Sequence, residues 1–149
     1  MVRAMVRGSY VSCQSALAHY GLIPEHVPVV TSVTTARPAR WETPLGVCEF
    51  QHIKTELLRG YQLTDLGEGQ EAFVAKPEKA LLDLVHLQPG GDAPDYLREL
   101  RLQNLDHLEL DELRRQADLT RSPKLRRAAA FVGERALRGA GVRNAIRCG

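Results

Sequence analysis

The chain has 149 residues, of which 44% are apolar and 26% are charged, and its formal net charge is +2; these values are typical of one soluble globular domain. No apolar run approaches the roughly 20 residues that cross a bilayer, and the first residues lack the apolar core of a secretion signal. Three widely spaced cysteines argue against a disulfide framework. We therefore expect a cytoplasmic protein without a membrane partner.

Residues 1–40 predict a helix followed by a strand. Ser12 can cap a helix that runs to about Tyr20, and Gly21 fits the left-handed position at which many helices end. Residues 28–35 (PVVTSVTT) are rich in β-branched side chains, which favour strands.

Two hairpins are predicted next. Residues 41–50 flank Pro44-Leu45-Gly46, where the positions of proline and glycine suit a type I turn. Residues 61–75 flank Gly67-Glu68-Gly69 and predict a second hairpin.

Residues 77–87 (PEKALLDLVHL) predict the helix around which the rest of the chain is organised. Pro77 suits the first helical position, where a missing N–H costs nothing. Leu81, Leu84 and Val85 recur at helical spacing, and further apolar residues widen the face. Because so much of this helix is apolar, we expect a sheet on one side of it and other helices on the other.

The remaining chain predicts three helices. The first covers residues 93–102, the second is capped by Asp111, and the third begins at Ser122-Pro123 and ends at Gly139. Residues 139–149 are expected to be frayed, as chain ends usually are.

The order of these elements predicts the fold class. A helix, consecutive hairpins and then helices indicate an α+β fold with a small, mostly antiparallel sheet of four to five strands packed against helices, and with a helical C-terminal third. No linker interrupts the sequence, so we expect one domain over residues 1–149, with residues 1–8 frayed.

The search for catalytic and metal chemistry gives no convincing site. Cys48 and His52 lie four apart in a predicted strand, but no second pair completes four metal ligands. Glycine motifs that cradle phosphate are absent. Ser15 and His19 can face each other on the first helix, but a nucleophile also needs an orienting group and an oxyanion hole. We therefore expect no catalytic residue, no metal and no cofactor.

Charge is distributed unevenly along the chain. Residues 1–40 carry +3, residues 41–110 carry −7 and residues 111–149 carry +6. The last third contains a group of cations that we call the basic cluster: Arg114, Arg115, Arg121, Lys124, Arg126 and Arg127. Aromatic residues do not alternate with these cations, so a nucleic acid would be bound through phosphates rather than by base stacking. A solvated helix surface is the simpler interpretation of the same pattern.

Three blocks of the sequence resemble the antitoxin domain of the AbiEi family. The first block is residues 10–25 (YVSCQSALAHYGLIPE), and the third is residues 75–84 (AKPEKALLDL). The second consists of residues 31–35 (TSVTT), 42–46 (ETPLG) and 52–54 (HIK). The order and spacing of the blocks agree with the family as well as the residue types, and the similarity extends over about residues 8–138.

The resemblance implies a bacterial antitoxin of an abortive-infection system, which defends against phage. Such antitoxins counteract an AbiEii-like nucleotidyltransferase toxin without forming a stable complex, and they repress their own operon. Members of the family typically carry an N-terminal winged helix-turn-helix that binds operator DNA, whereas this sequence begins where the following domain would begin. We therefore expect a non-enzymatic antitoxin and transcriptional-regulator domain, with a toxin as its functional partner. Any DNA contact is expected through the basic cluster, with weak sequence specificity and strong salt dependence.

The resemblance also singles out a set of polar positions: Tyr20, Thr31, Ser32, His52, Lys54, Lys76, Glu78, Lys79 and Asp83. Two interpretations of them remain open. Lys79 and Asp83 are four apart on a predicted helix and can simply pair with each other. The strand hydroxyls of Thr31 and Ser32 suit either an internal network or a partner.

Two other functions compete with the antitoxin hypothesis. One is a divergent or degenerate nuclease-like domain that acts on nucleic acid, since a small sheet flanked by helices can host such a site. A two-metal nuclease places an acid on one strand and Glu-x-Lys on the next, but here Glu49 and Lys54 have the wrong spacing. The other is a DNA-binding accessory protein without an enzymatic role.

Overall fold

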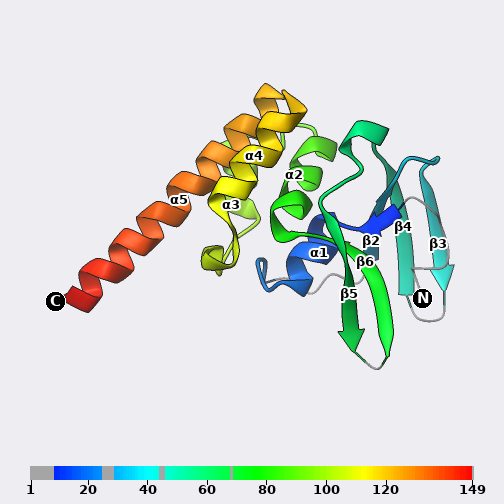
Figure 1. The fold of residues 1–149 in the computed structure, drawn as a ribbon, viewed down its shortest axis with the longest axis horizontal. Coiled ribbons are helices and arrows are strands. Elements are labelled where there is room, and N and C mark those ends of the chain that lie inside the picture. The colour runs from blue at the N-terminus through cyan, green and yellow to red at the C-terminus, as the bar shows by residue number, and fades with distance from the viewer. Residues whose placement is uncertain (1–8, 25–28, 44–45, 68, 149) are drawn as a thin grey trace.

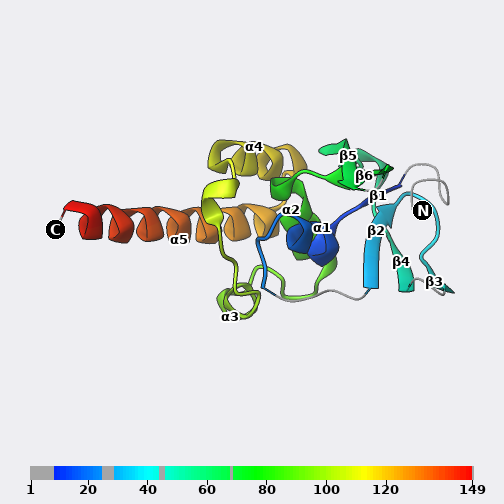
Figure 2. The ribbon, with the colours of Figure 1, turned by 90° about the horizontal axis from the view of Figure 1, so that it is seen from below.

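The computed structural model describes residues 9–24, 29–43, 46–67 and 69–148, and its fold is of the α+β class that the sequence predicts. A six-stranded sheet lies at one end of the molecule (Figure 1). The helices are α1 (Cys13–His19), α2 (Pro77–Leu87), α3 (Pro94–Glu99), α4 (Leu110–Thr120) and α5 (Pro123–Cys148). In the view from below, α1 and α2 lie between the sheet and the layer formed by α4 and α5 (Figure 2).

The sheet is larger than expected and mixed in direction. Its strands are β1 (Ser9–Val11), β2 (Val29–Thr34), β3 (Ala39–Thr43), β4 (Gly46–His52), β5 (Tyr61–Gly67) and β6 (Gln70–Ala75). They are arranged in the order β3-β4-β2-β1-β6-β5. The prediction of four to five mostly antiparallel strands was wrong on both counts, because β4 pairs in parallel with β2 and β1 pairs in parallel with β6.

Both predicted hairpins are confirmed. The β3–β4 pair and the β5–β6 pair are antiparallel. The type I turn predicted for Pro44-Leu45-Gly46 falls partly on residues outside the described part of the chain. In the sheet, β1 joins the two hairpin-containing halves, since it pairs with β2 on one side and with β6 on the other.

Helix α2 has the bounds and the central position that the sequence predicts. Pro77 occupies its first turn, and Leu81 and Val85 are almost completely buried. The helix contacts β6 and α1 on one side and α4 and α5 on the other. Burial of a leucine or valine side chain contributes about 1.5–3 kcal/mol to the folded state, so α2 organises the core between the two layers.

The ends of α1 agree only in part with the prediction. Ser12 is the residue before the helix, but its side chain makes no capping hydrogen bond. At the other end, Gly21 has a φ of +73° and the N–H of Leu22 bonds the carbonyl of Leu17 at 2.9 Å, as expected for a glycine that ends a helix.

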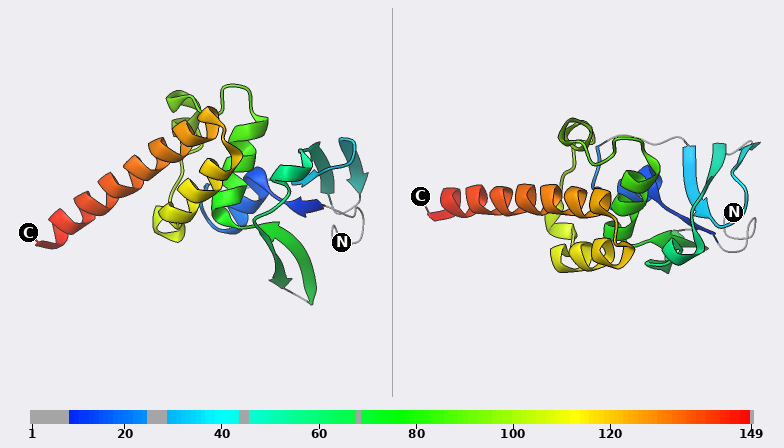
Figure 3. Two further views of the ribbon diagram at one scale, coloured as in Figure 1. Left: turned by 45° about the horizontal axis from the view of Figure 1, so that its top comes forward. Right: turned by 90° about the horizontal axis from the view of Figure 1, so that it is seen from above.

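The C-terminal helices differ from the prediction at their boundaries. Helix α4 begins after Glu109, so Asp111 lies in its first turn and is not the cap. The N–H of Leu125 donates to Ser122 Oγ at 3.3 Å, which confirms the predicted start of α5. Gly139 does not end this helix, because α5 continues to Cys148 and extends away from the rest of the chain (Figure 3); a glycine inside a helix costs only about 1 kcal/mol. Residues 1–8 lie outside the described part.

None of the helices in the described ranges is long and apolar enough to span a membrane.

Candidate functional site

Four polar side chains meet inside the protein where β1 passes beside α2. They are Tyr10 on β1, Ser12 at the β1–α1 junction, and Lys79 and Asp83 on α2, and we call them the Asp83 network. All four are buried; the side chains of Lys79 and Asp83 are only 4% and 2% exposed. Lys79 and Asp83 are two of the polar positions that the family resemblance singles out.

Asp83 accepts hydrogen bonds from every other member of the network. Tyr10 Oη donates to Oδ2 at 2.9 Å, Ser12 Oγ donates to the same oxygen at 2.6 Å, and Lys79 Nζ pairs with Oδ1. Lys79 Nζ also donates to Tyr10 Oη at 3.1 Å. The Ser12 hydroxyl that was predicted to cap α1 therefore bonds Asp83 instead, 71 positions away in sequence.

Burial dominates the ionisation of these groups. Desolvation raises the pKa of Asp83 above its usual value, although the charge and hydrogen bond of Lys79 and the bonds from Ser12 and Tyr10 offset part of this rise. Burial followed by the Asp83 charge raises the pKa of Tyr10, and the same two causes raise the pKa of the Cys13 thiol. Tyr10 and Cys13 are therefore neutral near pH 7, so neither the hydroxyl nor the thiol is an activated nucleophile.

The surroundings close the network off from solvent. The Tyr61 ring stacks on the Tyr10 ring with 4.7 Å between centroids. Gly60 lies so close to Lys79 that an added Cβ would stand 2.9 Å from Cγ of the lysine. An ion pair this deeply buried has no access to a substrate, and it fixes β1 to α2.

Two further polar positions singled out by the resemblance form hydrogen bonds that link different elements. Tyr20 Oη donates to the carbonyl of Ala75 at 2.7 Å, which links the end of α1 to the end of β6. Glu78 Oε2 accepts the N–H of Glu109 at 3.0 Å, which links α2 to the start of α4. Burial raises the pKa of Glu78, and the bond from Glu109 offsets part of that rise.

The other motif residues do not form a site. Ser32 is buried on β2, and its Oγ has no hydrogen-bond partner among the described residues. The N–H of Thr31 donates to Ser15 Oγ at 2.8 Å. His52 is exposed and its Nδ1 lies 3.1 Å from the carbonyl of Ala36, while Lys54 is exposed.

Lys76 is exposed and directly precedes α2.

The catalytic and metal candidates of the sequence are not assembled into a site. Ser15 Oγ donates to the carbonyl of Val29 at 2.9 Å, so this hydroxyl ties α1 to β2. Across residues 9–24, 29–43, 46–67 and 69–148, no group of three or more His, Cys, Asp or Glu side chains could hold a metal ion, and Cys48 and His52 gain no additional ligands.

Most side chains of the basic cluster form ion pairs or hydrogen bonds within the protein. Arg115 pairs with Glu112, Arg126 with Asp118 and Arg127 with Asp92. Lys124 Nζ lies 2.7 Å from the carbonyl of Gln88. Within the described ranges, Arg114 and Arg121 are left without an ion-pair partner.

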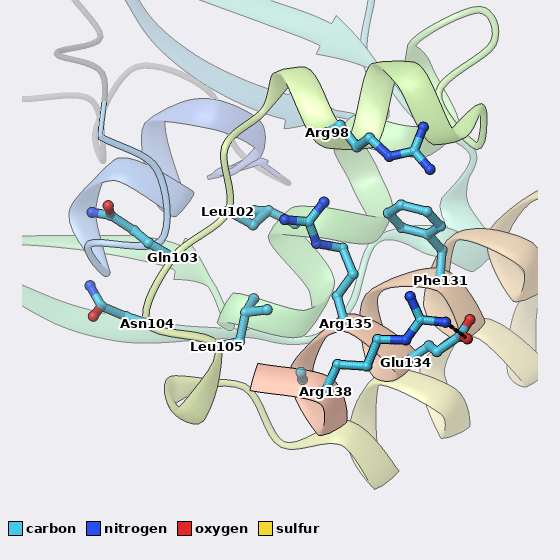
Figure 4. A pocket seen from close by; sticks show the side chains of 10 residues that line it. Arg98, Leu102, Gln103, Asn104, Leu105, Phe131, Glu134, Arg135 and Arg138 are labelled. Carbon is cyan, nitrogen blue, oxygen red and sulfur yellow. Dashed lines mark hydrogen bonds and ion pairs between the residues drawn. The ribbon is translucent and has the colours of Figure 1, made fainter. Parts of the chain in front are cut away.

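Sequence reasoning missed a second basic feature, a cleft of about 730 Å³ between the end of α3, the segment that follows it, and α5 (Figure 4). Three arginines line it, and none of them belongs to the basic cluster: Arg98, Arg135 and Arg138. Arg98 and Arg135 are separated by 37 positions in sequence, so only the packing of α3 against α5 brings them together. The one available signal was the excess of positive charge in residues 111–149.

Comparison with known proteins found no match to a family model, to a curated protein or to a solved structure.

Proposed function

We propose that the chain is a non-enzymatic antitoxin and regulator domain that acts in the cytoplasm and counteracts an AbiEii-like nucleotidyltransferase toxin. The observation that supports this most directly is the Asp83 network. Tyr10 and Ser12 come from the first of the three blocks that resemble the AbiEi family, and Lys79 and Asp83 come from the third. Blocks about 70 residues apart are thus joined by direct side-chain bonds, as expected of motifs that define one domain.

The positions of the motif residues support a role without catalysis. Lys79 and Asp83 are buried in the network, and Glu78 and Tyr20 each bond the backbone of another element. These groups stabilise the fold and leave the surface to interact with a partner. No observation in the structure specifically favours the nuclease-like alternative.

The experiment is growth rescue. The DNA beside the gene would first be read for a nucleotidyltransferase gene, and the chain would be co-expressed with its product; we expect cells that express both proteins to grow while cells that express the toxin alone do not. The control is Asp83→Ala, which breaks the network, and its rescue should fall in proportion to its loss of folded protein. Absence of rescue by the folded, wild-type chain with its neighbouring toxin would contradict the proposal.

A second measurement separates the antitoxin from the nuclease alternative. Purified chain would be incubated with single- and double-stranded DNA and RNA in Mg²⁺ or Mn²⁺. We expect intact nucleic acid. Metal-dependent cleavage that co-purifies with the chain would favour the nuclease-like domain instead.

A further inference from the structure

The cleft at α5 combines an apolar floor with a positively charged rim. Leu102, Leu105 and Phe131 contribute apolar surface, and all three are partly buried against the core. Arg98 comes from α3, while Arg135 comes from α5, the same helix as Phe131. Figure 4 shows Arg98 and Arg135 near the Phe131 ring and Arg138 directed toward Glu134.

Phe131 holds two of the arginines in place. The guanidinium carbon of Arg98 lies 5.6 Å from the ring centroid, and that of Arg135 lies 5.9 Å from it. Cation–π contacts at such distances orient a guanidinium while its N–H groups remain available to a ligand. The cleft therefore presents two guanidinium groups that lie against the same ring.

The charges around the cleft are incompletely balanced. Arg138 pairs with Glu134 at 2.6 Å, and Arg98 pairs with Asp95 at 3.2 Å, although the Asp95 side chain is 93% exposed and so well screened by water. In the part of the chain that the structure describes, Arg135 has only its contact with Phe131. The lining itself holds three arginines and one glutamate, so its net charge is +2, and Asp95 lies outside the lining.

We propose that this cleft binds a phosphate-bearing nucleotide. Arg135 and Arg98 would bond the phosphate oxygens, since guanidinium forks suit phosphate and make charge-assisted hydrogen bonds. The base would lie on the surface of Leu102 and Leu105 or against a guanidinium plane, as bases do in many nucleic-acid complexes. The size of the cleft is within the range of about 300–1,000 Å³ that holds small ligands. This proposal does not rest on the antitoxin function.

The test measures binding of two probes to the full chain: ADP, and an oligothymidylate of about ten nucleotides with a fluorescent label. Calorimetry would measure the binding of ADP, and fluorescence anisotropy would measure the binding of the oligonucleotide. We expect at least one probe to bind and Arg135→Gln to weaken its binding by about tenfold or more. Glu134→Gln should tighten the same binding, because it removes a negative charge from the rim and frees Arg138.

The control is Arg40→Gln. Arg40 is an exposed arginine on β3, at the opposite end of the protein, and like Arg138 it pairs with a glutamate. Its loss should leave binding unchanged within about twofold. Thermal unfolding of every variant would establish that each is folded under the conditions of the assay.

The outcomes distinguish the source of the phosphate. Binding of ADP indicates a free nucleotide, and binding of the oligonucleotide alone indicates a single-stranded nucleic acid. The proposal is overturned if neither probe binds, or if Arg135→Gln and Arg40→Gln reduce binding equally. It is also overturned if a glutamate-rich peptide binds more tightly than both probes, since that would indicate a carboxylate-bearing protein partner.

Discussion

Asp83 holds together side chains that come from two distant parts of the chain. The removal of its charge while Lys79 stays buried leaves an unpaired cation in the core, which typically costs about 3–5 kcal/mol. We therefore predict that Asp83→Asn lowers the free energy of unfolding by about that amount, as measured by denaturant titration. Replacement of both partners by apolar residues, Lys79→Met with Asp83→Leu, should cost less than the single change. A double variant that is as unstable as Asp83→Asn would contradict this account.

Gly60 allows Lys79 to reach the Asp83 network. Its φ is +75°, and an added Cβ would meet the lysine side chain at 2.9–3.0 Å. Gly69 has the same φ but no atom within 4 Å of an added Cβ, so it is a matched control. A left-handed alanine costs about 1–2 kcal/mol at either position. We predict that Gly60→Ala is more destabilising than Gly69→Ala, with the difference reporting the contact with Lys79; equal losses would argue against that contact.

At the level of the secondary elements, Glu78 connects α2 to the start of α4. Glu78→Gln keeps an oxygen that can accept the Glu109 N–H, whereas Glu78→Leu leaves this donor without its partner and should cost about 1–3 kcal/mol more. Hydrogen exchange of the first turn of α4 would report the loosened contact. Equal exchange in the two variants would mean that Glu78 does not hold α4.

The same residue gives a pH dependence. Burial raises the pKa of Glu78 in the folded chain above the ordinary 4.5, so between these two pKa values the folded state keeps a proton that the unfolded state has lost. The contribution of Glu78 to the free energy of unfolding therefore falls as pH rises through that interval. We predict that Glu78→Gln gains stability relative to the wild type as pH rises from 4 to 7, as measured by chemical unfolding at each pH. A difference that stays constant with pH would contradict the prediction.

Local signals explain which elements could be predicted. Helix α2 and both hairpins follow from spacing, prolines and glycines within a few residues, and the structure confirms them. Strand β1 was missed because three residues carry no periodicity. The parallel pairing of β2 with β4 was missed because β3 lies between them in sequence and no local pattern marks such a pairing. The predictions that Ser12 and Asp111 cap helices were wrong. A hydroxyl or carboxylate near the start of a helix can also bond elsewhere, and tertiary contacts decide which bond forms.

The candidate site was predicted less completely than the fold. The pairing of Lys79 with Asp83 was considered from their spacing, and the structure contains it. The participation of Tyr10 and Ser12, and the cleft around Phe131, depend on contacts between distant segments. A single sequence holds no local pattern for such contacts.

At the scale of the whole molecule, the internal ion pairs of the basic cluster bear on DNA binding. Arg126 and Arg127 already pair with aspartates, whereas Arg114 and Arg121 have no ion-pair partner among the described residues. If the chain binds DNA, we predict that Arg114→Ala with Arg121→Ala weakens binding more than Arg126→Ala with Arg127→Ala. Each double variant should weaken binding to DNA of unrelated sequences by the same factor. Each lost phosphate contact should lower the slope of log affinity against log salt concentration by about one. Anisotropy at several salt concentrations would measure this, and a sequence-selective loss would contradict it.

The position of β1 in the middle of the sheet sets an order for folding. One half of the sheet, β3-β4-β2, comes from residues 29–52, and the other, β5-β6, comes from residues 61–75, so each half can form from contacts close in sequence. Isolated hairpins form in about 1–10 μs. The halves join only when β1 lies between them, with Val11 paired to Val74.

During synthesis, β1 leaves the ribosome first, yet its second neighbour is complete only at Ala75. At about 5–20 residues per second, the newly made strand waits for several seconds with one edge unpaired. Until β6 is made, β1 presents an unpaired edge of the kind through which two chains can exchange a strand.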